Sequence, residues 1–411
     1  MPDYDFLIVG AGIAGLFCGL ELLKRNKDQK ICILEQYDYV GGRMLTHRQK
    51  GAQWEIAAGR YSERHPMLLA LIKKYGLHSI PIGRGDHSGF AELIPTFMDP
   101  LHSLSPQMLA THTLGELLTK VHGAHAHDFL QLFPYWSEIW ALRADLGFYS
   151  FASEFRGGEE FYVCKEGLQS VTDHMRSEYE ALGGMIQLSV KVLDVQEQAR
   201  GVRVLVQPMN YEKGLLRPAA PKGDLHASHC ILAMPVFPLK KLPSVHMPAL
   251  KHLTMEPLIR MYAIFPTTGG KSWFSFMKGN QVFPDNRIRY FIPIHSAKGL
   301  CMISYTDGDD ARYWIKMLDT KHRPFVQEKV MKEIRLLFPD LSIPEPTEFH
   351  TYPWHDGCSY WRPGSYDPEA MCKSALRVSK HVSACGESLS MRQAWIEGAL
   401  ESATELLKHL E

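Results

Sequence analysis

The glycine pattern Gly10-Ala-Gly12-Ile-Ala-Gly15 constrains the fold more than any other feature of the chain. It follows an apolar run, Asp5 to Val9, that predicts a short buried strand, and it opens residues 14–23, which predict a helix. The three glycines allow a tight turn, close approach of the backbone to a pyrophosphate, and close packing of helix on strand. We therefore expect a dinucleotide site at the start of this helix, where Ile13 and Ala14 lie.

A carboxylate ends the second predicted strand, at the position that a dinucleotide-binding unit requires. The next predicted strand, Lys30 to Leu34, ends at Glu35, which lies 20 residues beyond Gly15. A carboxylate at that spacing binds the ribose hydroxyls of a dinucleotide. Glu35 and the adjacent Gln36 are therefore predicted to contact the cofactor.

A second glycine motif, Gly41-Gly42-Arg43, decides between dinucleotide cofactors. Its glycines let the chain wrap the phosphate side of the cofactor, and Arg43 can pair with the pyrophosphate as a fork. Nicotinamide enzymes have no need of this element. The two motifs together predict FAD.

Composition excludes several classes of partner. The 411 residues suffice for two or three domains, and 45 basic residues balance 45 acidic ones, which argues against nucleic acid or an anionic membrane as partner. The eight cysteines and 20 histidines form no pattern with metal-ligand spacing. The apolar run Phe6 to Leu23 has an acidic flank and internal glycines, so we interpret it as strand and helix, not as a membrane span. A soluble, cytoplasmic protein without a metal is expected.

Local patterns divide the chain into three parts. Residues 186–206 alternate as two strands, 252–306 suggest a mixed sheet, and 393–410 predict a final helix. We predict an α/β fold: a doubly wound, Rossmann-like FAD-binding domain, a substrate domain with a mixed sheet, and a helical insert. The predicted boundaries are 1–60, 160–236 and 375–411 for the FAD-binding domain, 61–104 and 237–374 for the substrate domain, and 105–159 for the insert.

These motifs resemble those of the flavin-containing amine oxidase superfamily, which includes polyamine oxidases and L-amino-acid oxidases. Glu166-Gly167-Leu168 is similar to the segment before the second cofactor strand of that family, and Ala233-Met-Pro235 to its strand exit. Gly386-Glu387 and the segment Trp395 to Ala399 resemble the C-terminal motif, whose glutamate contacts the ribityl-phosphate region. The resemblance implies further FAD contacts from Gly59, Arg60, Val192, Gly386, Glu387, Trp395 and Ile396.

The segment Ala57 to Pro66, AAGRYSERHP, is similar to the part of L-amino-acid oxidases in which an arginine shortly before a histidine holds the substrate carboxylate. Only arginine offers a planar, permanently charged fork to such a group. Arg60 is the candidate. Two alternatives remain open: Arg60 caps a helix, or it pairs with the FAD itself.

Two aromatic residues are candidates for the slot that aligns an amine on the flavin in this superfamily. Trp395 stands where the C-terminal motif places one ring, and Tyr366 is the candidate for the other; for each, packing in the core is the alternative. Tyr290 is a candidate hydrogen-bond donor to the carboxylate. Ser365 stands where monoamine oxidases carry the cysteine that bonds the flavin, so non-covalent FAD is expected.

One departure from the family pattern concerns the lysine linked through water to flavin N5, usually just after a strand like Leu258 to Phe265. This chain has Pro266-Thr-Thr there, and Lys271 is the nearest lysine. Either Lys271 reaches round to the flavin, or another residue partners N5.

The resemblance as a whole implies an FAD-dependent oxidase that converts an L-amino acid to a 2-oxo acid, ammonia and hydrogen peroxide, with hydride transfer to flavin N5. An amine or polyamine oxidase is the first alternative, and a flavin-bearing interaction protein with little turnover is the second. The expected partners are a small amino acid or amine and molecular oxygen. Whether the chain forms a homo-oligomer is left open by the sequence.

Overall fold

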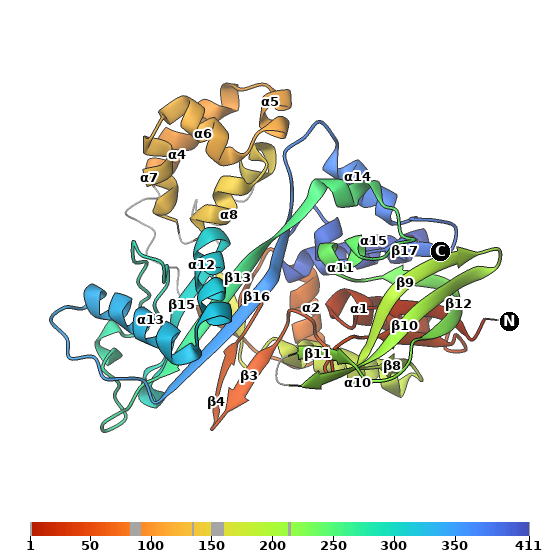
Figure 1. Ribbon diagram of the computed structural model, residues 1–411, viewed down its shortest axis with the longest axis horizontal. Helices are drawn as coiled ribbons and strands as arrows, with labels where there is room; N and C mark the ends of the chain where they lie inside the picture. The colour runs from red at the N-terminus through yellow and green to blue at the C-terminus, as the bar shows by residue number, and fades with distance from the viewer. Residues whose placement is uncertain (1, 83–91, 134, 149–159, 213–214, 411) are drawn as a thin grey trace.

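The computed structural model describes residues 2–82, 92–133, 135–148, 160–212 and 215–410. Its largest sheet has eight strands in the order β11-β10-β12-β1-β2-β8, with β17 paired to β12 and β9 to β10 (Figure 1). The pairs around β1 are parallel, whereas β9, β10 and β11 add antiparallel pairs. The bounds are β1 (Tyr4–Val9), β2 (Ile31–Leu34), β8 (Met185–Gln187), β9 (Val190–Gln198), β10 (Gly201–Glu212), β11 (Leu215–Pro218), β12 (Gly223–Leu232) and β17 (Val382–Ala384).

Both faces of this sheet are buried, as the continuous apolar runs of β1 and β2 require. Ile8, Ile33 and Ile231 face a helical layer on one side. Leu7 and Leu232 face the other side, which the β9–β10 hairpin and the short helix α11 (Val236–Lys240) cover. The helical layer comprises α1 (Ile13–Arg25), α2 (Pro66–Lys74), α10 (Gln169–Ala181) and α15 (Ile396–His409).

A second sheet has the order β14-β15-β13-β16, and all three pairings are antiparallel. Its long strands β13 and β16 lie side by side across the molecule, with α12 and α13 packed on the sheet (Figure 1). The sheet predicted to be mixed is therefore antiparallel, and parallel and antiparallel pairs occur together only in the eight-stranded sheet among the described strands. The bounds are β13 (Leu253–Ile264), β14 (Ile292–His295), β15 (Leu300–Asp307), β16 (Glu348–Trp361), α12 (Gly308–Thr320) and α13 (Arg323–Leu337).

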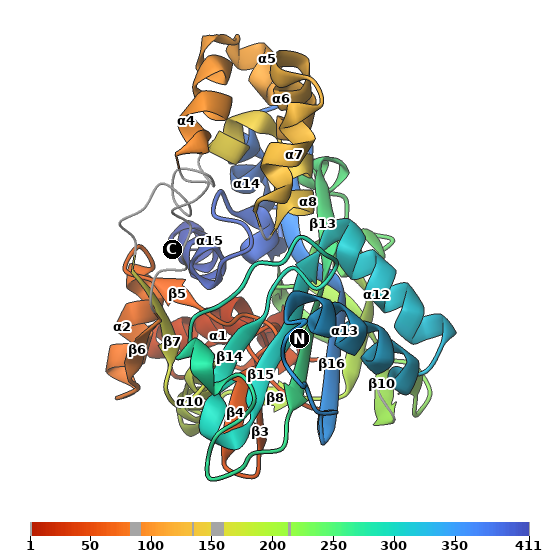
Figure 2. The same cartoon turned by 90° about the vertical axis from the view of Figure 1, so that its left-hand side faces the viewer.

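The predicted helical insert has a core of its own and extends beyond the two sheets, and it contacts the end of β15 (Figures 1 and 2). Ile94, Met98 and Leu101 share this core, so the helical part begins near Leu93, before the predicted boundary at 105; predicted insert residues 149–159 lie outside the described ranges. The α/β class with a helical insert is confirmed. Its helices are α4 (Leu93–Met98), η1 (Asp99–Ser103), α5 (Pro106–Thr111), α6 (Leu114–His122), α7 (His125–Gln131) and α8 (Trp136–Ala141).

Two small sheets and several short helices complete the described fold. One of the small sheets has the order β5-β7-β6, and the other pairs β3 with β4. The strand β5 begins at the residue that follows Arg60. Their bounds are β3 (Thr46–Gln49), β4 (Ala52–Glu55), β5 (Tyr61–Ser62), β6 (Ser79–Ile82), β7 (Phe161–Cys164), η2 (Pro248–His252), η3 (Ser275–Met277), η4 (Ser296–Lys298), α14 (Pro368–Ala375) and η5 (Glu387–Leu389).

Candidate functional site

The glycine turn between β1 and α1 combines tight packing with one open position. A Cβ atom at Gly10 would lie 2.4 Å from the Ala233 carbonyl oxygen, and one at Gly15 would lie 2.0 Å from the Gly10 carbonyl oxygen. At Gly12, a Cβ would meet no heavy atom within 4 Å. The outer glycines are therefore required by packing, whereas Gly12 borders the space into which a pyrophosphate would fit.

The N-terminus of α1 has no side-chain cap, so its backbone N–H groups can bind an anion. Gly12 is its N-cap residue, so no side chain accepts a hydrogen bond from the first turn, and that turn contains no acidic residue. The second glycine motif lies against the first: the Gly41 N–H donates to the Ala11 carbonyl at 2.9 Å, and a Cβ at Gly42 would lie 3.3 Å from the Gly12 Cα. The backbone N–H groups and partial positive charge of the helix end remain available to phosphate.

Glu35 ends β2 beside this turn. Its Oε2 accepts the Ala11 N–H at 2.9 Å, and its Oε1 accepts the Tyr37 N–H at 3.0 Å. Burial raises the pKa of the Glu35 carboxyl, and these backbone donors oppose that rise. Gln36 follows in the same turn, and the buried Val192 lies on β9, whose first residue bonds to the Glu35 carbonyl.

Arg43 and Glu387 form an ion pair between segments 344 residues apart. The Arg43 Nη2 lies 2.8 Å from the Glu387 Oε2, and the Arg43 Nη1 donates to the Gly357 carbonyl at 2.9 Å. The buried Glu387 carboxylate also accepts the Ser359 N–H at 3.0 Å and the Ala394 N–H at 2.8 Å. This pair fixes the second glycine motif to the chain that leads into α15.

The turn before α15 carries two predicted cofactor contacts. Gly386 has φ +127°, a conformation that favours glycine, and a Cβ there would meet nothing within 4 Å. Trp395 is the N-cap residue of α15 and makes no capping hydrogen bond, and Ile396 is the first helical residue. The open positions at Gly12 and Gly386 and the two uncapped helix ends fit an extended dinucleotide.

Arg60 lies among aromatic rings. Its guanidinium carbon is 4.5 Å from the ring centre of Phe161 and 5.8 Å from those of Tyr135 and Trp395. Tyr135 also lies 5.5 Å from Tyr290 and 5.3 Å from Tyr305, between ring centres. We call Tyr135, Phe161, Tyr290, Tyr305 and Trp395 the aromatic cluster.

His65 lies beside Trp395 and is 4% exposed. Its ring centre lies 4.7 Å from that of Trp395, and its Nδ1 accepts the Ser62 N–H at 3.0 Å. Burial, together with the charges of Arg392 and Arg60, lowers the pKa of His65 to about 4. His65 is therefore a neutral residue that holds the Arg60 segment against Trp395.

Arg260 is a site residue that the sequence analysis missed. It projects from β13 with its guanidinium carbon 4.4 Å from the ring centre of Tyr305, and its Nη1 donates to the Glu55 carbonyl at 3.1 Å. A Cβ at Gly59 would lie 2.5 Å from the same Nη1, so this glycine gives the guanidinium its space. The available signal was a single arginine within the otherwise apolar run Leu258 to Phe265.

Two predicted catalytic residues lie elsewhere. Tyr366 stacks on His252, with ring centres 3.8 Å apart, and its hydroxyl donates to the Arg362 carbonyl. Within the described chain it makes no ring contact with Trp395, whose ring neighbours are His65 and Phe161. Lys271 is exposed at the tip of a turn closed by hydrogen bonds to Thr268, and no recorded contact joins it to the aromatic cluster.

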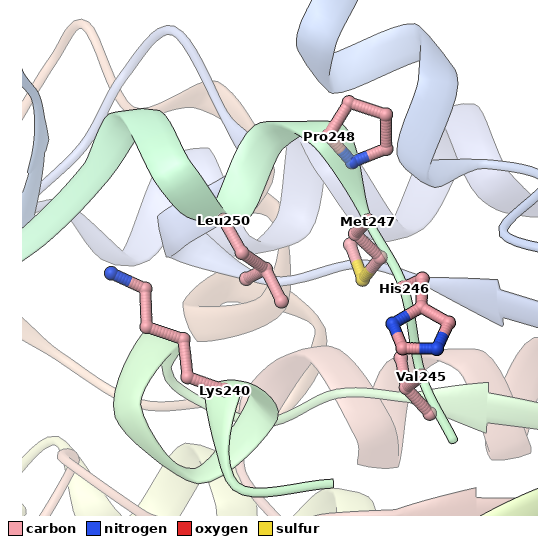
Figure 3. A pocket seen from close by; sticks show the side chains of 6 residues that line it. All are labelled: Lys240, Val245, His246, Met247, Pro248 and Leu250. Atoms are coloured by element: carbon pink, nitrogen blue, oxygen red, sulfur yellow. The ribbon is translucent and has the colours of Figure 1, made fainter. Parts of the chain in front are cut away.

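No group of three His, Cys, Asp or Glu side chains among the described residues is placed to hold a metal ion, and none of the described helices is long and apolar enough to cross a membrane. A surface hollow between α11 and η2 is lined by Lys240, Val245, His246, Met247, Pro248 and Leu250 (Figure 3). None of the site residues above contributes to it.

An uncapped glycine turn, a ribose-side carboxylate and a second glycine–arginine motif define a dinucleotide-binding flavoprotein. Comparison with known families agrees: the model for flavin-containing amine oxidoreductases matches residues 13–94 and 96–405. The chain belongs to this family. Membership of this family implies FAD as the cofactor.

Individual relatives match over short segments. An L-amino-acid oxidase of Echis ocellatus is 36% identical over 75 residues, which are 18% of this chain and 14% of the relative. One of Bungarus fasciatus is 37% identical over 73 residues, 17% of this chain and 14% of the relative. A mitochondrial L-2-hydroxyglutarate dehydrogenase of Dictyostelium discoideum is 50% identical over 46 residues, 11% of this chain and 10% of the relative. The matches thus span about a seventh of the L-amino-acid oxidases.

Proposed function

We propose that the protein oxidises L-amino acids to 2-oxo acids and ammonia, with Arg60 as the anchor of the substrate carboxylate. The observation that carries this proposal is the position of the Arg60 guanidinium among the rings of Phe161, Tyr135 and Trp395, the last of which is the N-cap residue of α15. A planar cation walled by rings offers a carboxylate a bidentate partner and excludes water from it.

The residues of the chain would bind and orient the substrate. Arg60 would hold the carboxylate, while the ring faces of Trp395 and Tyr135 would receive the ammonium group, because aromatic faces attract cations. His65, which is neutral above pH 4, would keep the Arg60 segment in place without adding a second charge. When bound, FAD would supply the redox chemistry, as the acceptor of hydride from the substrate Cα and the donor of two electrons to oxygen, which would yield hydrogen peroxide. The imino acid that remains is hydrolysed in water.

Three features support Arg60 over Lys271 and Tyr366 as the determinant of substrate class. It lies beside Gly59, it contacts three rings of the aromatic cluster, and it precedes α2, whose start is bonded to α15. An amine or polyamine oxidase has no carboxylate to bind. In such an enzyme, a cation at this position would repel the protonated substrate.

Anaerobic flavin reduction tests the proposal. The wild-type holoenzyme is mixed separately with pools of L-amino acids, D-amino acids and polyamines, and the loss of flavin absorbance is followed. We expect reduction by the L-amino-acid pool. Reduction by amines alone would assign the protein to the amine oxidases, and no reduction by any pool would support the flavin-bearing interaction protein.

Substitutions of Arg60 test whether this residue binds the substrate carboxylate. Arg60→Met should lower kcat/KM for L-amino acids by about 100-fold or more, because a carboxylate would lose its charged partner, and Arg60→Lys should recover part of the loss. Arg64→Met is the matched control, because Arg64 is an exposed arginine of the same segment. Equal activity of Arg60→Met and wild type, at equal FAD content, would refute the assignment.

A further inference from the structure

Arg260 is a buried cation whose charge the chain does not balance. Its side chain is 8% exposed. Across the described residues, no Asp or Glu oxygen lies within 4.0 Å of an Arg260 nitrogen. Its nearest partners are neutral: the Glu55 carbonyl and the phenols of Tyr305 and Tyr262. A buried charge without a counter-charge costs several kcal/mol, so a protein retains one where a ligand supplies the opposite charge.

Glu55 is the nearest acidic residue, and its carboxylate is directed elsewhere. Its Oε1 accepts the Leu168 N–H at 2.7 Å, and its Oε2 accepts the Thr46 hydroxyl at 2.9 Å. Burial raises the pKa of the Glu55 carboxyl to about 7, although Arg260 and the two hydrogen bonds oppose that rise. The Glu55 carboxyl is therefore only partly ionised at neutral pH, so it does not neutralise the positive charge of Arg260.

Arg260 and Arg60 border the same part of the aromatic cluster. The Arg260 guanidinium lies on the Tyr305 ring, Tyr305 contacts Tyr135, and Arg60 lies 5.8 Å from the Tyr135 ring centre. Burial raises the pKa of the Tyr305 phenol, and both arginines oppose that rise, so both charges act at one hydroxyl. The Arg260 guanidinium also lies against Gly59, the residue that precedes Arg60.

We propose that Arg260 binds a carboxylate on the side chain of the substrate, so that the preferred substrates are L-amino acids with an acidic side chain. This inference rests on the proposed function, in which Arg60 takes the α-carboxylate. Arg260 then takes the second acid of the same molecule. The pair of guanidiniums selects a dicarboxylate over its neutral amide, because the amide leaves Arg260 without a counter-charge.

Kinetics of the holoenzyme test the selection. We expect wild-type kcat/KM for L-glutamate or L-aspartate to exceed that for the matching amide, L-glutamine or L-asparagine, by about 100-fold. Arg260→Met should abolish this preference by lowering the value for the acid about 100-fold while changing the value for the amide less than about 3-fold, and Arg260→Lys should keep part of it. Arg335→Met is the charge control, because Arg335 is exposed on α13 and pairs with Glu345.

Ligand binding separates this inference from the proposed function. Glutarate and butyrate, which cannot be oxidised at an amine, are titrated into the holoenzyme by calorimetry. We expect glutarate to bind about 100-fold more tightly than butyrate in the wild type and equally weakly in Arg260→Met. If glutarate shows this preference but no L-amino acid reduces the flavin, the dicarboxylate site stands and the proposed oxidation fails.

Three outcomes would overturn the inference. These are a wild type with no preference for acids, equal losses for acid and amide in Arg260→Met, and equal binding of glutarate and butyrate. Equal losses would assign Arg260 to the cofactor instead of to the substrate side chain. Thermal melting and FAD content are measured for each variant, and Arg260→Lys provides the comparison if the methionine variant does not fold.

Discussion

The Glu397 carboxylate caps the helix that follows Arg60: its Oε1 accepts the Met67 N–H at 2.8 Å, and its Oε2 accepts the Leu68 N–H at 3.0 Å. Glu397 is 0% exposed and lies in the first turn of α15, two residues after Trp395. One buried side chain therefore ties the start of α2 to the start of α15. This contact sets Arg60 and Trp395 relative to each other.

Glu397→Gln should lower both stability and activity. The amide keeps one acceptor but loses the charge that favours the N-terminus of α2, which costs about 1–2 kcal/mol of unfolding free energy. Because α2 holds the Arg60 segment, kcat/KM should also fall. Urea unfolding and steady-state kinetics measure the two effects. Glu401→Gln, on the same helix but partly exposed, is the control, and a stability equal to wild type in Glu397→Gln would show that the cap is unimportant.

The glycines at 12 and 15 should respond oppositely to alanine. Gly15→Ala should destabilise the protein even without cofactor, because the new Cβ would lie 2.0 Å from a backbone oxygen. Gly12→Ala should leave apoprotein stability unchanged or raise it by about 0.5 kcal/mol, since its φ of −72° suits alanine, while FAD affinity falls more than about 10-fold. Thermal melting of the apoprotein measures the change in stability, and a flavin fluorescence titration measures the change in FAD affinity. Unchanged FAD affinity in Gly12→Ala would place the pyrophosphate elsewhere.

The Arg43–Glu387 pair should couple more strongly than an exposed pair. A double-mutant cycle with Arg43→Met and Glu387→Gln is expected to give about 1–3 kcal/mol, because the glutamate is buried. The same cycle on Lys408 and Glu405, whose side chains are 61% and 59% exposed, should give less than about 0.5 kcal/mol. Equal values in both cycles would mean that the buried pair does not fix the turn before α15.

Asp307 should make stability fall as pH rises from 4 to 8. Its buried carboxyl has a pKa raised by burial to about 7, against 3.8 in the unfolded chain, although the Glu138 N–H donates to it at 2.8 Å. The folded state therefore binds the proton more tightly, and the resulting stability is complete below pH 3.8 and is lost as pH rises through 7.

Asp307→Asn should remove this loss, because the amide stays neutral and its oxygen still accepts the Glu138 N–H. Urea unfolding at pH 5, 6, 7 and 8 should show the difference between variant and wild type changing by up to about 1.4 kcal/mol per pH unit. Asp309→Asn, which changes a 66% exposed residue of α12, is expected to leave the profile unchanged. Parallel profiles for wild type and Asp307→Asn would contradict the assignment.

The cofactor half of the site was predictable because its signals are local. Three glycines at fixed spacing and Glu35 at the end of the next strand each act within one strand–turn–helix unit. Arg43 and Glu387 are 344 residues apart, and only a family resemblance pointed to both. The structure adds their direct pairing, which neither segment indicates alone.

The substrate half was less predictable because its residues converge from separate elements. Arg60 lies within a recognisable segment, but Tyr135 comes from the insert, Phe161 from β7 and Arg260 from β13. No sequence spacing relates them. Tyr366 was predicted to form the second side of the slot, whereas its ring packs on His252, and Arg260 lies within an apolar strand with no motif around it.

The discontinuous layout of the eight-stranded sheet has a consequence for biosynthesis. The strand β17 pairs with β12, and Glu387 and α15 follow it, whereas Arg43 and α1 belong to a segment that is translated well before them, since Arg43 precedes Glu387 by 344 residues. The early segment must therefore wait, with its apolar faces uncovered, until residues 382–409 have been translated. Cofactor loading is then a post-translational event, and a chain that stalls late in synthesis would present chaperones with an exposed half-sheet.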